Sequence, residues 1–384
     1  MKLLGHSALV ALISMGLPAI AAAASVTKAP APKEKSAVRT ETVVTGLDHP
    51  WAIQFLPEGG MLVTERPGTM RLIAKDGTLS PPIAGVPKVV AVGQGGLLDV
   101  ALAPDFAQSR RIFFTFSEPR GGGRNATAVA SATLTPSGNT AKLDNVKVIF
   151  RQQPAMASTF HFGSRIAIAP DGTLFVTLGE RNRARDQAQN PANHIGKVVH
   201  IDQDGLPAPG NPRKPGWAPT VWSIGHRNPQ AAAIHPQTGQ LWTVEHGARG
   251  GDELNRPQAG RNYGWPVITY GRDYSGARIG EGTSKPGMEQ PVYYWDPSIA
   301  PSGMTFYTGK LFPAWNGSIL VGALAGSHVA RLVLDGDAVV AEEKLLAGLG
   351  ERIRDVRQGP DGAIYIATDS AQGRILKIVP AGPG

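Results

Sequence analysis

His161 and Glu180 are the residues of this sequence whose types best suit the removal of a proton from a substrate. The neutral imidazole of a histidine accepts a proton near pH 7, and a nearby carboxylate fixes its tautomer and raises its basicity. Taken alone, His161 is a weak signal, because a single histidine is more often structural than catalytic. Both residues lie in short polar segments, 161–165 and 178–181, on either side of a strand-like stretch. A fold that brings these segments together would create a general base.

Three arginines outside these segments, Arg227, Arg352 and Arg354, could bind an anion. The planar guanidinium group pairs with both oxygens of a carboxylate or phosphate group. Several such side chains in one pocket would therefore imply a bound polyanion. The further arginine-rich stretch at residues 181–185 is interpreted as a solvated loop.

The composition excludes several other kinds of site. The chain has no cysteine, so it has no disulfides, thiolate metal sites or cysteine nucleophile. It also lacks a Gly-x-Ser-x-Gly elbow and a His-Glu-x-x-His zinc motif. The glycines at residues 93–96 lack the strand–helix context of a dinucleotide-binding loop. The net charge of +8 is scattered rather than clustered with aromatic residues, which excludes a nucleic-acid surface and favours a basic pocket for an acidic small molecule.

One turn-and-strand pattern recurs six times and predicts the elements that must position these residues. In each copy, a turn with Pro, Asp, Asn or Gly precedes or enters a short alternating strand, which is a strong hairpin signal. The copies span residues 55–66, 102–116, 168–181, 234–247, 314–324 and 358–369. Six copies predict an all-β fold, a six-bladed β-propeller of four-stranded antiparallel blades. A β-sandwich is the alternative, but it would not explain six copies of one unit.

The two ends of the chain complete this picture. Residues 38–44 alternate and are expected to pair with the last strand, 374–379, and so to close the ring. Residues 1–24 combine Lys2, an apolar run and small residues, which predicts a secretory signal peptide. Residues 25–37 are rich in Pro, Ala and Lys and predict a flexible linker, followed by the propeller catalytic domain at 38–381. We expect a periplasmic or secreted protein with no membrane insertion after cleavage. A membrane anchor is the alternative, but the apolar run is shorter than the ~20 residues of a span.

The sequence resembles the soluble aldose sugar dehydrogenases that depend on pyrroloquinoline quinone (PQQ), within the glucose/sorbosone dehydrogenase family. The resemblance covers about residues 40–380, the whole predicted domain. It rests on the segments HPWAIQFLPEGGMLVTER, GQGGLLDVALAPDF, HFGSRIAIAPDGTLFVTLGER, GHRNPQ, EHGARGGDELN, GRNYGWP, SGMTFY and RIRDVRQGPDGAIY.

This resemblance implies a central cleft that holds PQQ and calcium. It implies that His161 is the general base, that Glu180 orients it, and that Arg227 stabilises negative charge on the quinone. The implied contacts to PQQ come from Gln94, Arg227, Asn228, Thr269, Tyr274, Arg352 and Arg354. The backbone carbonyls of Gly247 and Ala248 would hold the cofactor calcium, and Glu253 and Tyr263 would hold a second, structural calcium. Relatives often have Pro in place of Ala248, a change that a carbonyl ligand tolerates.

The implied reaction is oxidation of the C1 hydroxyl of an aldose sugar to a lactone, with hydride transfer to PQQ. The electrons would then pass to an external acceptor that the sequence does not identify, and we expect a monomer. A calcium-dependent propeller lactonase or a non-catalytic binding propeller is the alternative. The arginines argue against a lactonase, because a neutral lactone offers three guanidinium groups nothing to pair with.

One position departs from the pattern of the family. Relatives often carry Lys after Gly-Ala-Leu, where this chain has Ala325. We therefore expect weaker or differently balanced PQQ binding, unless Arg331 or a residue of the 181–185 stretch supplies the missing charge. Asp252 is left open between the calcium shell and a turn, and the neighbouring His226 and His246 are interpreted as structural.

Overall fold

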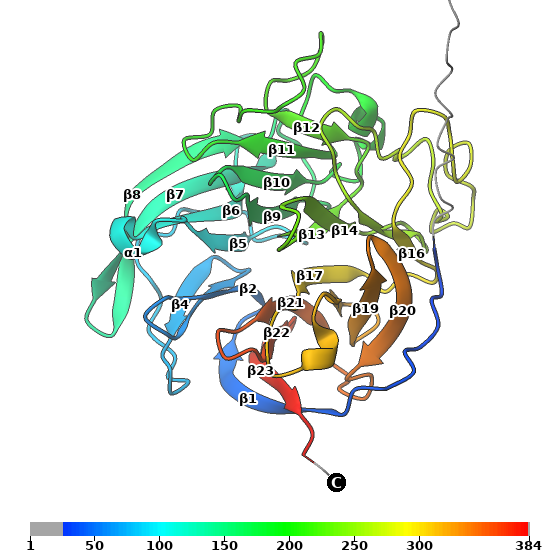
Figure 1. The fold of residues 1–384 in the computed structure, drawn as a ribbon. Coiled ribbons are helices and arrows are strands. Elements are labelled where there is room, and N and C mark those ends of the chain that lie inside the picture. The colour runs from blue at the N-terminus through cyan, green and yellow to red at the C-terminus, as the bar shows by residue number, and fades with distance from the viewer. Residues whose placement is uncertain (1–25, 383–384) are drawn as a thin grey trace, which may run out of the picture.

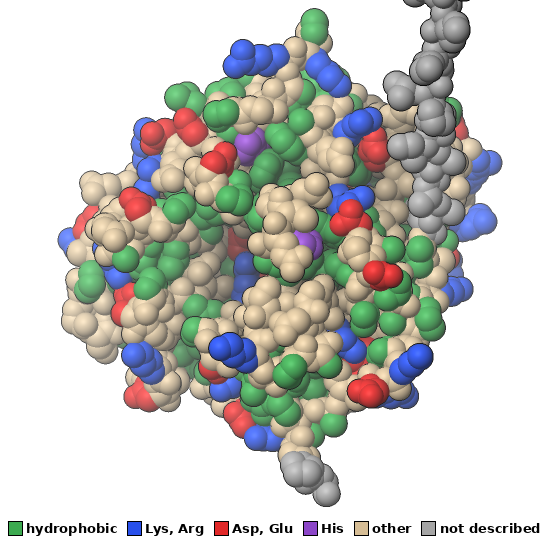
Figure 2. Space-filling model, viewed as in Figure 1, with side chains coloured by type: hydrophobic (Ala, Val, Ile, Leu, Met, Phe, Trp, Pro, Cys, Tyr) green, Lys and Arg blue, Asp and Glu red, His purple; other side chains and the backbone are tan. Residues whose placement is uncertain are grey.

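A computed structural model describes residues 26–382 as six antiparallel sheets arranged around a central axis (Figure 1). Residues 1–24, the predicted signal peptide, lie outside the described residues. Figure 2 shows one face of the resulting disc, which is hollowed at its centre, with basic and acidic side chains visible inside the hollow. The arrangement confirms the predicted six-bladed β-propeller.

The blades follow one another in chain order. The first contains β2 (Pro50–Phe55), β3 (Met61–Glu65) and β4 (Thr69–Ile73). The second contains β5 (Leu97–Leu102), β6 (Arg111–Pro119), β7 (Asn125–Ser137) and β8 (Thr140–Arg151). The third contains β9 (Gly163–Ile168), β10 (Leu174–Leu178), β11 (Lys197–Ile201) and β12 (Val221–Ile224).

The other three blades complete the ring. The fourth contains β13 (Pro229–Ile234), β14 (Leu241–Glu245), β15 (Asp252–Asn255) and β16 (Tyr293–Trp295). The fifth contains β17 (Pro301–Phe306), β18 (Ile319–Ala323), β19 (Val329–Asp335) and β20 (Ala338–Leu345). The sixth contains β21 (Ile353–Gln358), β22 (Ile364–Thr368), β23 (Gly373–Pro380) and β1 (Val38–Leu47).

Helix is confined to three short pieces in the described part of the chain. They are α1 (Phe106–Ser109) and two 3₁₀ turns, η1 (Arg185–Gln189) and η2 (Pro313–Trp315). Within residues 26–382, no helix has the length and apolar character needed to cross a membrane.

The ring closes as predicted, through the two ends of the chain. β1 pairs antiparallel with β23, from Val38 opposite Pro380 to Leu47 opposite Gly373, with two irregularities in the register. This pairing leaves no open seam between the first and last blades, because the N-terminal strand completes the sixth sheet.

The first blade has three regular strands, and an irregular segment occupies the fourth position. The amides of Ser80 and Ile83 donate to the carbonyls of Leu72 and Met70, at 2.9 and 2.8 Å. Residues 81 and 82 are both proline, which has no amide hydrogen to donate, so a regular ladder cannot form there.

The core lies between the blades. Six clusters of buried apolar side chains each join two neighbouring sheets, one cluster in each gap around the ring. Threonines of the second strands reinforce three of these gaps. Thr64, Thr115 and Thr177 donate to the carbonyls of Leu98, Ser164 and Pro229 in the next blade, at 2.5, 2.7 and 2.9 Å.

Residues 26–37 differ from the expectation of a flexible linker. The Thr27 hydroxyl donates to the Tyr294 carbonyl at 2.8 Å, and the Pro30 carbonyl accepts from the amide of Glu342 at 2.9 Å. The Ser36 hydroxyl donates to the Glu343 carboxylate at 2.8 Å. The segment therefore lies across the outer strands of the fourth and fifth blades. Composition alone missed this, because the partner groups belong to residues 267 to 312 positions further along the chain.

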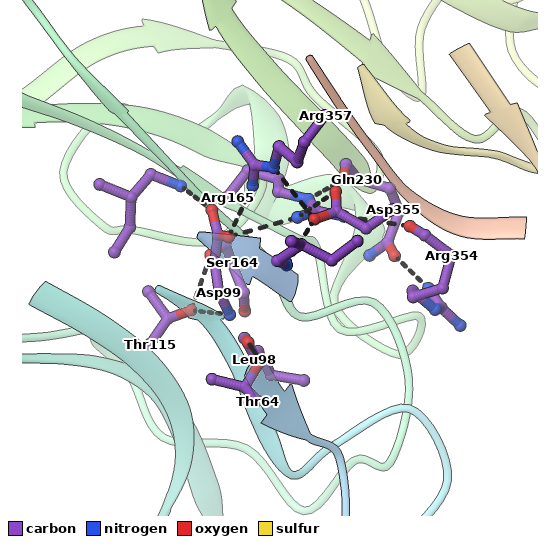
Figure 3. Close-up of polar contacts among 12 residues, drawn as sticks. Thr64, Leu98, Asp99, Thr115, Ser164, Arg165, Gln230, Arg354, Asp355 and Arg357 are labelled. Carbon is purple, nitrogen blue, oxygen red and sulfur yellow. Dashed lines mark hydrogen bonds and ion pairs between the residues drawn. The ribbon is translucent and has the colours of Figure 1, made fainter. Parts of the chain in front are cut away.

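A buried ion network ties the inner strands together at the axis (Figure 3). Nη1 of Arg165 on β9 lies 3.2 Å from Asp99 on β5 and 3.0 Å from Asp355 on β21. Arg357 bridges the same two carboxylates, at 3.0 Å from each. Asp99 and Asp355 also accept the amides of Ile166 and Ile53 in the next blades, at 2.8 and 2.9 Å. These contacts fix the relative positions of the inner strands, from whose ends the candidate site is built.

Candidate active site

The predicted base and its carboxylate lie in direct contact. Nδ1 of His161 lies 2.6 Å from Oε1 of Glu180, and both side chains are buried. The other ring nitrogen, Nε2, makes no hydrogen bond to any described residue, so it is free to meet a substrate. Burial, together with the nearby Arg227 and Arg181 guanidinium groups, lowers the pKa of His161, although Glu180 opposes this. The imidazole is therefore neutral near pH 7 and can accept a proton.

The backbone around this pair is specialised. His161 has a φ of 51° and Gly163 a φ of 63°, both in the left-handed region. Gly179 lies so close to the His161 carbonyl that an added Cβ would come within 2.0 Å of that oxygen. Only glycine at position 179 lets the end of β10 approach the segment before β9 closely enough for Glu180 to reach the imidazole.

Gln94 holds the other side of His161. Its side-chain Oε1 accepts the backbone amide of His161 at 2.8 Å, and its backbone amide donates to the Thr159 carbonyl at 2.8 Å. Gln94, predicted to contact PQQ, thus also positions the segment that carries the base.

Arg227 and Asn228 lie next to Glu180. The amide of Glu180 donates to the Arg227 carbonyl at 2.9 Å, and the Asn228 carboxamide oxygen accepts the Gly163 amide at 3.1 Å. The Arg227 guanidinium donates to the carbonyls of His246 and Gly247 and lies 5.2 Å from the ring centre of Trp265. These contacts place one of the predicted anion-binding arginines beside the base.

The other two arginines connect to the same place through two residues that the sequence analysis did not single out. Gln230 contacts Asn228 at 3.3 Å and accepts from Arg354 at 3.0 Å. Asp369 accepts from Arg354 at 3.0 Å and from Arg352 at 3.4 Å. The three predicted arginines therefore belong to one connected cluster, with Arg354 buried and Arg352 exposed.

Several buried polar atoms of this cluster have no partner. They are Oε2 of Glu180, Nε of Arg227, Nδ2 of Asn228 and Nε of Arg354. An unpaired buried polar atom is costly, and native proteins seldom leave one without a protein, water or ligand partner. The three unpaired N–H groups are donors, which fits a bound group rich in carboxylate and carbonyl oxygens.

A small cavity brings together five of the predicted cofactor and metal residues. It has a volume of about 10 Å³, room for one water-sized atom. Its walls include Arg227, Gly247, Glu253, Tyr263 and Thr269. Burial, with the adjacent Glu245 carboxylate, raises the pKa of Glu253 to about 8. Without a bound cation, Glu253 therefore holds its proton near pH 7, and a cation bound beside Glu245 and Glu253 would favour the ionised carboxylates.

The residues here suit a calcium site built on backbone oxygens. Among residues 26–382, no three His, Asp or Glu side chains converge as a metal-binding group. Calcium also accepts carbonyl ligands, and the predicted ligand carbonyl of Gly247 lies at this cavity, where it accepts from the Arg227 guanidinium in this structure. Asp252 is committed elsewhere: its carboxylate accepts the amides of Gly247, Ile299 and Ala300, at 2.8 to 3.0 Å. Asp252 therefore shapes the loop.

Tyr274 stands apart from the cluster. Its side chain is 72% exposed, in the long connection between β15 and β16, and no described residue contacts its hydroxyl. The structure does not bring it to the buried cluster, so its contact with PQQ stays a prediction.

Arg181 is the clearest error of the sequence interpretation. It is fully buried rather than solvated, and Nη2 donates to Asn125 Oδ1 at 2.6 Å and to the Ser158 carbonyl at 2.8 Å. Burial lowers its pKa to about 10, so it stays charged. Arg331 is also buried and pairs with Glu343 at 2.9 Å. Neither arginine is therefore free to supply the charge missing at Ala325.

The histidines next to the site, interpreted from the sequence as structural, contact other protein groups, with His226 buried and His246 half-buried. His226 lies between Ser223 and Glu245, at 2.8 and 2.9 Å. His246 Nε2 lies 2.6 Å from the Pro301 carbonyl. Burial, and then the charge of Arg227, lowers the pKa of His246 to about 3. Both side chains support the loops around Arg227.

Comparison with known proteins gives consistent matches over nearly the whole chain. The profile of the glucose/sorbosone dehydrogenase family matches residues 47–377. The chain is 45% identical to the aldose sugar dehydrogenase YliI of Escherichia coli (strain K12) over 348 residues, 89% of this chain and 93% of that one. A crystal structure of a glucose dehydrogenase is 52% identical, with a TM-score of 0.86 over 90% of this chain and 100% of that one. The PQQ-bound aldose sugar dehydrogenase of Streptomyces coelicolor is 31% identical, with a TM-score of 0.75 over 91% and 99% of the two chains.

Proposed function

The chain belongs to the glucose/sorbosone dehydrogenase family of oxidoreductases, and from that premise we propose that it oxidises the C1 hydroxyl of aldose sugars with PQQ and calcium. A PQQ-bound relative and an aldose sugar dehydrogenase among the matches support the cofactor and the substrate class. The observation that carries the proposal is the buried pair of His161 and Glu180 beside arginines with unpaired N–H groups.

The chain would hold PQQ through donors that are already in place. Arg227, Asn228 and Arg354 each have an unpaired buried N–H group, and Arg352 lies at the exposed end of the same cluster. Guanidinium groups pair strongly with carboxylates, which the cofactor carries. We assign the remaining contacts to Gln94, Thr269 and Tyr274. Backbone carbonyls of Gly247 and Ala248 would hold the cofactor calcium, and Glu253 and Tyr263 would hold a second, structural calcium.

The proton transfer follows from the state of His161. Nε2 of the neutral imidazole accepts the proton of the C1 hydroxyl, while Nδ1–H stays hydrogen-bonded to Glu180. The carboxylate stabilises the imidazolium as it forms. When bound, PQQ supplies the acceptor for the hydride that C1 loses, and the sugar leaves as a lactone. An external electron acceptor must later remove two electrons, and we leave its identity open.

Export to the periplasm or the outside of the cell also remains part of the proposal. It rests on the sequence of residues 1–24 alone.

A single assay separates this function from its alternative. The apo-protein is mixed with PQQ, calcium and a reducible dye, and dye reduction is followed after addition of glucose. We expect reduction only when sugar, PQQ and calcium are all present. Lactone hydrolysis without PQQ, and no dye reduction with any aldose, would instead favour the propeller lactonase.

A further inference from the structure

An exposed aromatic ring lies directly beside the base. Among residues 26–382 only two aromatic side chains of Phe, Tyr and Trp are exposed, Phe160 and Tyr274. Phe160 is 47% exposed, and its ring centre lies 6.3 Å from that of His161, at an interplanar angle of 74°. Isolated apolar side chains are common on protein surfaces, so exposure alone proves nothing.

What sets Phe160 apart is the rigidity of the backbone that presents it. Arg181, fully buried, donates from Nε to the Phe160 carbonyl at 3.1 Å. The Phe160 amide donates to Ser158 Oγ at 3.3 Å, and the amide of the next residue, His161, donates to Gln94 at 2.8 Å. Three residues thus hold the peptide groups on both sides of Phe160 while its ring stays in solvent.

Arg181 serves this arrangement at an energetic cost. Its guanidinium lies 3.9 Å from the ring centre of Phe162 and forms no ion pair with a carboxylate of residues 26–382. Its guanidinium donates to the carbonyls of Ser158 and Phe160 in the loop that carries Phe160, and also to Asn125 and Gln152. Burying an arginine without a carboxylate partner is costly, and the contacts that this one makes with the carbonyls of Ser158 and Phe160 position the segment 158–161.

The position of the ring determines what can lie against it. A sugar whose C1 hydroxyl meets Nε2 of His161 would bring its ring carbons close to the imidazole, and the exposed Phe160 ring lies 6.3 Å from the centre of that imidazole. The C–H bonds of a pyranose form an apolar face, and aromatic rings pack favourably against such faces. A polar or charged substrate without that face would gain nothing from Phe160.

We propose that Phe160 is a specificity-determining residue whose ring packs against the C–H face of the aldose ring being oxidised. The proposal rests on the proposed function, because it requires a sugar at His161. It assigns to Phe160 a contact with the substrate, and to Arg181 the positioning of that contact.

The test compares Phe160→Ala and Phe160→Trp with the parent protein, all loaded with PQQ and calcium. We expect Phe160→Ala to raise KM for glucose about 3- to 10-fold, with kcat within about twofold, and Phe160→Trp to restore KM. Calorimetric titration with 1,5-anhydroglucitol, which lacks the C1 hydroxyl, should show the same fold-change in Kd. This second measurement reports sugar binding without turnover.

Val340→Ala provides a matched control, since Val340 is 45% exposed on β20 in the fifth blade and should leave both constants unchanged. PQQ titration and the Tm should stay at the parent values in Phe160→Ala. If KM and the analogue Kd are unchanged in Phe160→Ala while the parent oxidises glucose, the inference is overturned. A fall in kcat alone also overturns it, because the ring would then act through His161. If the parent oxidises no aldose, the proposed function itself fails.

Discussion

The imidazole of His161 and the carboxylate of Glu180 form a pair that only one ring orientation allows, with Nδ1 2.6 Å from Oε1 and the backbone held by Gln94. The pair fixes which nitrogen faces the substrate. The pair also predicts how turnover and its pH dependence will change when either residue is replaced.

Replacement of the base should abolish turnover but not cofactor binding. We expect His161→Gln to lower kcat by about 10²- to 10⁴-fold, the usual contribution of general base catalysis. PQQ titration should give a Kd near that of the parent, because the N–H donors assigned to PQQ are retained. His200→Gln is the matched control, since His200 is buried in the third blade beside Thr173 and should retain full turnover. Near-normal turnover of His161→Gln would remove His161 from its role.

Replacement of Glu180 should change the pH profile as well as the rate. Glu180 raises the pKa of His161 against the effects of burial and Arg227, so Glu180→Gln lowers that pKa further. Because the base must be neutral, kcat/KM rises with pH through this pKa, and the acid limb should move to lower pH. The plateau should fall by about 10- to 100-fold. Glu343→Gln is the control, because Glu343 belongs to a different buried pair, with Arg331, and should leave the acid limb of the pH profile in place. If the acid limb also stays in place in Glu180→Gln, Glu180 does not set the pKa of His161.

Removal of calcium should weaken both PQQ binding and stability. A metal that binds only the folded chain stabilises it by about 2.7 kcal/mol at 100 times its Kd. We expect calcium to raise the Tm of the chelator-treated protein, and Glu253→Gln to reduce that rise. Equal Tm values with and without calcium would contradict the proposed metal site. Magnesium at the same concentration controls for ionic strength.

Introducing a lysine at Ala325 should strengthen PQQ binding. The carbonyl of the preceding residue, Leu324, accepts from Arg352 at 3.3 Å, so position 325 lies next to the arginine cluster. We expect Ala325→Lys to lower the Kd for PQQ about tenfold, the effect of one added charged hydrogen bond. Ala325→Met has a similar side-chain length and no charge, and should leave the Kd unchanged. An unchanged Kd in Ala325→Lys would show that the arginine cluster already neutralises the charge of the cofactor without a lysine at position 325.

Breaking the axial ion network should cost stability. We expect Asp355→Asn to lower the free energy of unfolding by about 3 kcal/mol at pH 7, because Arg165 and Arg357 lose one of their two carboxylates. Burial opposes ionisation of Asp355, but the two arginines outweigh it and hold its pKa below the usual range. Its contribution is therefore present above about pH 4 and is lost as the pH falls further. Urea unfolding of parent and variant should converge in acid, whereas exposed Asp186→Asn should match the parent throughout.

The sequence predicted the blades because each copy of the repeat carries its own local signals. It also predicted the pairing of His161 with Glu180, since both flank strands of one copy and so meet at one end of the blade. Arg181 was misread because its neighbours are polar, whereas its burial depends on Asn125 and Ser158 in another part of the chain. Gln230 and Asp369 sit at repeated strand ends, a signal that could have marked them.

Two other features lay beyond local patterns. The position of Tyr274 depends on the path of a long connection that no strand periodicity determines. The contacts of residues 26–37 depend on the outer edges of the fourth and fifth blades, which exist only after those blades have formed.

The pairing of β1 with β23 also governs how this protein can be made. A nascent chain can assemble five blades while it emerges, but its sixth sheet lacks β23, the partner of both β1 and β22, until residues 373–380 are made. Until then the first strand has no partner, and the incomplete ring exposes edges that invite aggregation or proteolysis. Ring closure therefore waits for β23, and a chain that stops before Gly373 would leave β1 without its partner strand.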